Sequence, residues 1–213
     1  MDLANDAAFV MGSVEDLPII YKDMQQQFPE CEMYKYKSYV QLLHNGEYKI
    51  LKYQRSEDNE LIGYALVYIV ESSNILWLDY LAIRKKYQAL GYGSAMFKAL
   101  VQKYCGPFDG ILFSVEHISK TDAKLAESQK KRVRFYERLG AKKLSADFLQ
   151  PCEDGGFPMY LFFKPRRGCN VISRESQIQT IGQMYDYCFP NSKHSRELLP
   201  KFKDTIVNER LCK

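Results

Sequence analysis

The chain has 213 residues, of which 46% are hydrophobic and 14% aromatic, and it carries 30 Lys and Arg against 26 Asp and Glu. This length and composition fit one globular domain with an appendage better than two full domains. The longest apolar stretches, residues 61–70 and 75–83, are separated by polar residues 71–74, and neither reaches the roughly 18 residues of a membrane-spanning helix. We therefore expect no membrane segment. Because no basic segment precedes an apolar one at the N-terminus, we expect a cytoplasmic rather than a secreted protein.

The cysteines and the charges narrow the range of partners. The 6 cysteines are scattered without the spacing of a zinc site, so we expect reduced thiols and no metal. Residues 165–213 hold 9 basic and 5 acidic residues, so the net charge of +4 lies entirely in this last quarter of the chain. At this low density we expect a solvated helical surface rather than a docking face for nucleic acid or an acidic partner.

The first third of the chain predicts two helices. In residues 14–27, Asp16 is placed to cap a helix that has Pro18 in its first turn. Residues 33–43 form the second helical segment, which is rich in tyrosine: Tyr34, Tyr36 and Tyr39. These tyrosines either line a site or serve amphipathic packing.

The following elements alternate between strands and helices. We expect strands at residues 48–53, 61–70, 75–83, 111–115 and 159–163, and helices at residues 94–104 and 122–139, the latter ended by Gly140. A hairpin before the alternating part and a late strand after it indicate a mixed α/β sheet rather than a purely parallel one. Residues 173–187 and 195–211 read as helices. We therefore divide the chain into a domain of residues 1–164 and a C-terminal helical extension of residues 165–213, which packs on the core or on a second subunit of a homodimer.

The glycine-rich turn Gln88–Gly93 lies between the predicted strand 75–83 and the predicted helix 94–104. Glycines at the start of a helix let unpaired backbone N–H groups approach a phosphate. A dinucleotide-binding fingerprint would need a third glycine where Met96 stands, and the Gly-Lys-Ser/Thr of a Walker A motif is absent. A tight turn with no ligand remains the alternative if this motif is taken alone.

Two further segments accompany the turn. The strand end reads Leu-Asp-Tyr-Leu-Ala-Ile at residues 78–83, the turn reads Gln-Ala-Leu-Gly-Tyr-Gly at residues 88–93, and residues 134–141 read Arg-Phe-Tyr-Glu-Arg-Leu-Gly-Ala. Together, in this order and spacing, they resemble the GNAT superfamily of acyl-CoA-dependent N-acetyltransferases. The likeness covers about residues 7–164, is strongest over residues 75–141, and leaves the extension unexplained. It implies a mixed, mostly antiparallel central sheet flanked by helices.

The resemblance also implies where acetyl-CoA binds as the co-substrate. The backbone of one strand end would pair with pantetheine, the N–H groups of the turn would hold the pyrophosphate, and Gln88 would add a side-chain donor. Residues 84–86 could add positive potential. The implied co-substrate residues are Leu81, Ala82, Ile83, Gln88, Ala89, Leu90, Gly91, Tyr92, Gly93 and Ser94.

Acetyl transfer to an amine requires a base near the acceptor. An amine with a pKa of about 10.4 is neutral only in a small fraction at pH 7, which costs roughly 4–5 kcal/mol. Asp79, in an otherwise apolar strand, and Glu116, at the end of the strand 111–115, are the two candidates, with His117 as a third. Tyr136 matches the position of the tyrosine that protonates the leaving thiolate in the family; packing at the helix end is its alternative role.

These assignments predict direct transfer of an acetyl group from acetyl-CoA to a primary amine, without a metal or a covalent enzyme intermediate. We expect a small-molecule acceptor between residues 33–43 and the loop 151–158, where Glu153 and Asp154 could attract a cation. A protein or other macromolecular acceptor is one alternative. The other alternative is a module that senses acyl-CoA without turnover.

Overall fold

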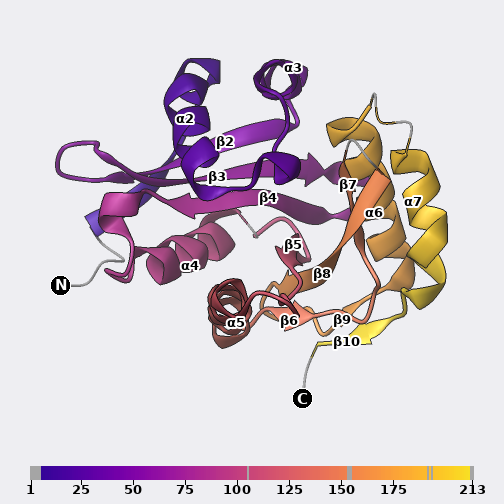
Figure 1. Cartoon of the computed structure of the whole chain (residues 1–213). Helices are drawn as coiled ribbons and strands as arrows, with labels where there is room; N and C mark the ends of the chain where they lie inside the picture. The colour runs from indigo at the N-terminus through magenta and orange to yellow at the C-terminus, as the bar shows by residue number, and fades with distance from the viewer. Residues whose placement is uncertain (1–5, 105, 153–154, 191, 193, 212–213) are drawn as a thin grey trace. The chain divides into compact units, whose positions relative to one another are not determined.

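The computed structural model describes the chain except residues 1–5, 105, 153–154, 191, 193 and 212–213 (Figure 1). The chain forms two compact units. The first comprises Met1–Ile69 and Leu78–Tyr104, and the second comprises Val70–Trp77 and Cys105–Lys213. Strand β4 (Ile75–Ile83) contributes residues to both. The division at residue 164 that the sequence suggests stays a prediction.

The first unit is an antiparallel sheet with helices from the first half of the chain. Its strands follow the order β1-β2-β3-β4. The elements are β1 (Ala7–Met11), α2 (Leu17–Gln27), α3 (Tyr36–Asn45), β2 (Tyr48–Arg55), β3 (Leu61–Val70), the C-terminal part of β4, and α4 (Tyr92–Tyr104), with one-turn 3-10 helices at Val14–Asp16, Glu30–Glu32 and Lys85–Tyr87. In Figure 1, α2 and α3 lie on one side of β2 and β3, and α4 lies on the other.

The central strands are buried on both faces. Tyr48 and Ile50 on one face of β2 and Tyr53 on the other are buried, and β3 is buried over nearly its whole length, as expected for a strand covered on both faces. At the outer strand, Gly12 N–H donates to Ile50 O at 2.8 Å, and Lys103 Nζ of α4 donates to Phe9 O of β1 at 2.7 Å.

The second unit is built around β5 (Gly110–Glu116). Ile75–Trp77 of β4 pairs with it in parallel, and β8 (Gly155–Pro165) pairs with it antiparallel along its full length. The other elements are η3 (Glu71–Ser73), α5 (Ala123–Arg138), β6 (Lys142–Lys143), β7 (Leu149–Cys152), β9 (Val171–Ile172), α6 (Arg174–Cys188), α7 (Ser195–Phe202), η5 (Lys203–Thr205) and β10 (Glu209–Arg210).

The C-terminal helices pack on their own unit. Thr180 of α6 donates through Oγ1 to Ser73 Oγ at 2.8 Å, and both side chains are buried. Tyr185 Oη donates to Leu149 O of β7, and Phe202 of α7 packs edge-on against Phe148 with ring centroids 5.8 Å apart. Of the two alternatives left open by the sequence, the structure therefore shows packing on the core.

The predicted mixed, mostly antiparallel sheet flanked by helices is confirmed, and β3 and β4 have the predicted bounds. Gly140 ends α5 with a φ of +80°, as predicted. No helix in the described part of the chain is both long and apolar enough to cross a membrane.

Several predicted bounds were wrong. The helix predicted at residues 33–43 begins only at Tyr36, because Met33 and Lys35 have an extended backbone with ψ of 145°. The helix predicted at residues 195–211 ends at Phe202, where Thr205 Oγ1 donates to Phe202 O at 2.7 Å and the chain turns toward β10, which pairs with β9. The predicted loop 151–158 is largely the β7–β8 hairpin. Its acids Glu153 and Asp154 lie outside the described residues.

Candidate active site

The turn before α4 has the shape of an anion cradle. Ala89 and Gly91 have φ angles of 62° and 93°, in the left-handed region. Alternating left-handed and right-handed residues bring successive N–H groups toward one point, which forms an anion-binding concavity. Helix α4 begins at Tyr92, two residues earlier than predicted, so its positive end adjoins the turn.

The N–H groups of this turn are available to a ligand. Ser94 and Ala95 donate to Gly91 O at 3.1 and 3.3 Å, which starts the helix. The N–H groups of Ala89, Leu90 and Gly91 have no acceptor within the described part of the chain. A turn of this kind can hold an anion through its backbone alone.

The side chain of Gln88 is engaged inside the protein. Its Nε2 donates to Ile83 O and to Gln27 Oε1, each at 2.9 Å. A carboxamide nitrogen has two protons, and these two bonds use both. The predicted donor role of Gln88 toward a phosphate would require one of these bonds to break.

Two of the three basic residues before the turn are paired with acids. Arg84 Nε lies 3.8 Å from Asp23 Oδ1, and Lys86 forms an ion pair with Glu60. The hydrogen bond with Glu60 raises the pKa of Lys86. Positive potential near the turn is therefore partly offset.

Asp79 lies among tyrosines in the first unit. Its carboxylate accepts hydrogen bonds from Tyr34 Oη at 3.3 Å and from Tyr48 Oη. Tyr80 donates to Glu32 O, and burial raises the pKa of Tyr80 well above the usual value. Tyr39 is fully buried and packs on Tyr34 with ring centroids 5.1 Å apart. The tyrosines of the predicted helix 33–43 thus serve packing at Tyr39 and contact Asp79 at Tyr34.

Glu116 lies at the end of β5 in the second unit, where it forms an ion pair with Arg132 of α5. The side chain of Glu116 is 19% exposed. The next residue, His117, packs its ring on Tyr160 with centroids 4.2 Å apart. The charge of Glu116 is therefore balanced within its own unit, while its side chain keeps contact with solvent.

Tyr136 is buried in the last turn of α5. Its ring packs against Phe113 and Phe162 of the sheet, with ring centroids 4.6 and 6.3 Å away. Burial raises the pKa of Tyr136 to about 12, while the charge of Arg132 lowers this pKa and the charge of Glu116 raises it. Tyr136 thus meets the packing role that the sequence offered as an alternative, and its hydroxyl stays protonated at neutral pH.

The predicted residues fall into two groups. The strand end 81–83, the turn 88–94 and Asp79 belong to the first unit, and Glu116 and Tyr136 belong to the second. Within the described residues, no cluster of three or more His, Cys, Asp or Glu is arranged to hold a metal ion.

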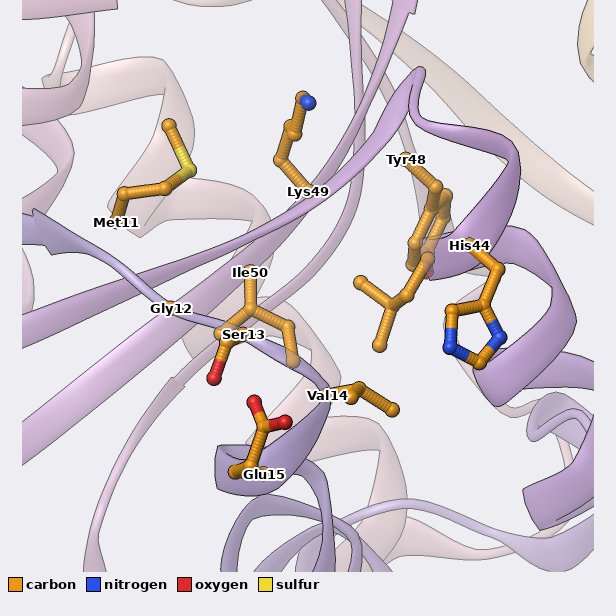
Figure 2. Close-up of a pocket in the computed structure, with 10 residues that line it drawn as sticks. Met11, Gly12, Ser13, Val14, Glu15, His44, Tyr48, Lys49 and Ile50 are labelled. Atoms are coloured by element: carbon orange, nitrogen blue, oxygen red, sulfur yellow. The ribbon is translucent and has the colours of Figure 1, made fainter.

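A pocket of about 260 Å³ in the first unit has none of the predicted catalytic or co-substrate residues in its lining (Figure 2). Its lining consists of Met11, Gly12, Ser13, Val14, Glu15, Leu43, His44, Tyr48, Lys49 and Ile50. Tyr48 lines this pocket and donates its hydroxyl to Asp79. Sequence reasoning missed this pocket, because its residues come from three segments that meet only in the fold.

Comparison with known proteins gives one family and one fold. The sequence model of the acetyltransferase (GNAT) family matches residues 17–141. A search among curated proteins finds no matching sequence.

Solved structures from several organisms are similar to the chain. A protein of Bacteroides thetaiotaomicron assigned to the GNAT acetyltransferases superposes with a TM-score of 0.67 at 18% identity, covering 84% of this chain and 96% of that one. The ribosomal-protein-S18-alanine N-acetyltransferase of Escherichia coli gives 0.54 at 18% identity, with coverages of 75% and 94%. The spermidine/spermine N-acetyltransferase SpeG of Vibrio cholerae gives 0.56 at 11% identity, with coverages of 77% and 95%. At these identities the likeness shows the fold alone.

Proposed function

Because the chain belongs to the acetyltransferase (GNAT) family, whose members are acyl-CoA-dependent N-acetyltransferases, we propose that it transfers the acetyl group of acetyl-CoA directly to a primary amine on a small molecule. The observation that carries this proposal is the turn before α4. There, left-handed Ala89 and Gly91 accompany three backbone N–H groups that have no acceptor among the described residues. Acetyl-CoA supplies a pyrophosphate for these groups.

In the proposed complex, the turn 88–94 holds the pyrophosphate and the backbone of Leu81, Ala82 and Ile83 pairs with the amides of pantetheine. Both parts belong to the first unit. Gly63 of β3 packs closely on this strand end, because a Cβ there would lie 2.5 Å from Ala82 O and 2.8 Å from Ile83 Cδ1. A residue without a side chain is therefore needed beside this strand end.

The reaction requires one proton to leave and one to be supplied. The amine nitrogen attacks the thioester carbonyl, so that an N–C bond forms, the C–S bond breaks, and the nitrogen loses a proton to a base. The departing thiolate takes up a proton and becomes free CoA. Neither step requires a covalent bond to the protein.

Tyr136 stabilises the departing sulfur in this proposal. With a pKa of about 12, the phenol is a weaker acid than a thiol with a pKa of about 8.5, and complete transfer of its proton would cost about 5 kcal/mol. Its contribution is therefore a hydrogen bond to the charge that develops on sulfur. The final proton comes from solvent.

The acceptor amine needs a base that removes its proton and an anionic group that binds its cation, and Glu116 and Asp79 divide these two roles. Glu116 keeps contact with solvent at the end of β5, which suits a base that acts through water. Asp79 is held by Tyr34 and Tyr48, and a half-buried carboxylate among aromatic rings suits an alkylammonium group. We assign proton removal to Glu116 and binding of the acceptor's cation to Asp79.

The acceptor is proposed as a small amine or polyamine because of this carboxylate and its tyrosines. Similar structures include an enzyme whose name specifies spermidine and spermine and another whose name specifies a ribosomal protein. An acceptor on a macromolecule is the second candidate. It is favoured only by the excess of basic over acidic residues in residues 165–213, and it predicts binding that weakens as salt concentration rises.

The first test is acetyl-CoA binding by calorimetry, followed by a screen for thiol release over amines, polyamines, amino acids and peptides. Binding with thiol release that depends on a small amine would support the proposal. Release only with peptides would favour the macromolecular acceptor, and binding without release would favour a sensor. A protein that binds no acetyl-CoA would contradict the proposal at its first step.

We also propose that the extension, residues 165–213, contributes to a homodimer. Its helices α6 and α7 pack on the core of the second unit, so a partner would contact their exposed faces. Sedimentation equilibrium of the intact protein tests this, and a single species at 24.9 kDa at high micromolar concentration would contradict it.

A further inference from the structure

A chain of side-chain hydrogen bonds joins the glycine-rich turn to helix α2. Gln88 Nε2 in the turn donates to Gln27 Oε1 at the end of α2 and to Ile83 O at the end of β4, each at 2.9 Å. One carboxamide thus fixes the first residue of the turn to two other elements of the same unit. Each contact restricts the position of the residues that follow.

The direction of these bonds is set by Asp23. Gln27 Nε2 donates to Asp23 Oδ2 at 2.5 Å. A carboxylate only accepts hydrogen bonds, so the amide nitrogen of Gln27 faces Asp23 and its oxygen faces Gln88. Gln88 must then present its nitrogen, which leaves its second proton for Ile83 O.

Asp23 is itself held in place. Tyr64 Oη of β3 donates to Asp23 Oδ2 at 2.9 Å, and Arg84 Nε lies 3.8 Å from Asp23 Oδ1. The Asp23 side chain is 14% exposed. Because the Asp23 carboxylate is mostly buried and contacts three side chains, it has little freedom to move. One of these side chains belongs to Arg84, the residue that directly follows Ile83.

We propose that Asp23 and Gln27 are positioning residues for the acyl-CoA turn and act on it through Gln88. This inference rests on the proposed function of the turn. The bonds hold Ala89, Leu90 and Gly91 in the conformation that presents their N–H groups, so less ordering is required when acetyl-CoA binds. Neither residue touches the reacting atoms. Their loss therefore weakens acetyl-CoA binding and raises its KM, while kcat at saturation is unchanged.

The test compares two neighbouring glutamines of α2. Gln27→Leu removes the bond to Gln88, and Gln26→Leu, an exposed residue one position earlier, is the matched control. We expect Gln27→Leu to weaken acetyl-CoA binding by about two- to twelvefold, the range of one hydrogen bond. Gln26→Leu should bind as the wild type does. Calorimetry gives Kd, and thiol release gives kcat and KM.

A double-mutant cycle separates positioning from a general loss of stability. Gln88→Leu and the double variant Gln27→Leu/Gln88→Leu complete the cycle. If Gln27 acts through Gln88, the double variant binds acetyl-CoA about as tightly as Gln88→Leu alone. Effects on Kd that simply multiply, or a Gln27→Leu variant that binds as Gln26→Leu does, would overturn the inference. A fall in kcat with an unchanged KM would overturn it as well.

A measurement on the ligand-free protein makes the inference independent of acetyl-CoA. Backbone ¹⁵N order parameters of Ala89, Leu90 and Gly91 should fall in Gln27→Leu from about 0.85 toward about 0.6, and stay unchanged in Gln26→Leu. If the wild type binds no acetyl-CoA, the proposed function fails and this comparison alone decides the positioning role. Order parameters that are equal in both variants would refute it.

Discussion

Removing the hydroxyl of Tyr136 tests catalysis and burial in one variant. Tyr136→Phe keeps the ring that packs against Phe113 and Phe162 and deletes only the proposed donor to sulfur. A hydrogen bond to a charged group contributes about 1.5–3 kcal/mol, so kcat should fall about ten- to a hundredfold. The KM for acetyl-CoA should stay unchanged, because the bond forms only as charge develops on sulfur.

The same variant should change how stability depends on pH. Burial raises the pKa of Tyr136 to about 12, whereas an unfolded tyrosine has a pKa of about 10. The neutral phenol is favoured in the folded state, so its contribution is fully present below pH 10 and is lost between about pH 10 and 12. At pH 11 the wild type should have lost about 1.4 kcal/mol of unfolding free energy that Tyr136→Phe does not lose.

The assays are steady-state kinetics at pH 7.5 and urea denaturation at pH 8 and pH 11. Tyr36→Phe, at a tyrosine with 36% exposure in the first unit, serves as the control and should leave kcat unchanged. An unchanged kcat in Tyr136→Phe would refute the proposed hydrogen bond to sulfur. An equal loss of stability in wild type and variant between the two pH values would refute the argument from burial.

Three further predictions concern glycines and charged residues. Gly63→Ala should lower Tm by about 2–12 °C, because overpacking against the strand end costs about 1–3 kcal/mol. Gly182→Ala in helix α6, where a Cβ would have a single described neighbour at 3.7 Å, should instead raise Tm by about 1–4 °C. Thermal denaturation measures both shifts, and equal shifts would contradict the packing argument. Glu116→Gln should mainly lower kcat and Asp79→Asn should mainly raise KM for the amine, so steady-state kinetics showing the reverse would exchange their roles. Gly91→Val should abolish acetyl-CoA binding in calorimetry, because φ is 93° there, at a cost of about 1–3 kcal/mol in stability; retained binding would contradict the anion cradle.

The central strands and the turn could be predicted because their signals are local. β3 and β4 are long runs of apolar, β-branched and aromatic residues bounded by polar turns, which fit a strand covered on both faces. The turn 88–93 combines glycines with the start of an apolar-periodic helix. The short strand β1, with five residues and a single clear alternation, carries too weak a period to be recognised.

The partners of the site residues could not be predicted, because they are far apart in sequence. Gln88 meets Gln27 across 61 positions, and Tyr34 meets Asp79 across 45. The sequence shows that Asp79 lies in an apolar strand and therefore needs a polar partner. Only the fold shows that this partner is a pair of tyrosine hydroxyls. Likewise, the helix pattern that continues beyond Phe202 is overridden by the pairing of β10 with β9, a tertiary contact that local periodicity does not record.

The bond between Lys103 and Phe9 has a consequence for how the protein behaves at high concentration. Because Gly12 faces β2 through its N–H group, the alternation of an antiparallel pair turns the peptide groups of Phe9 away from β2. Such outward groups are a template for strands of other molecules, and a lysine placed there blocks that template. Lys103 of helix α4 donates a hydrogen bond to Phe9 O, and Val10 and Met11 are exposed beside it. The residue therefore protects the sheet from growing by aggregation along its outermost strand.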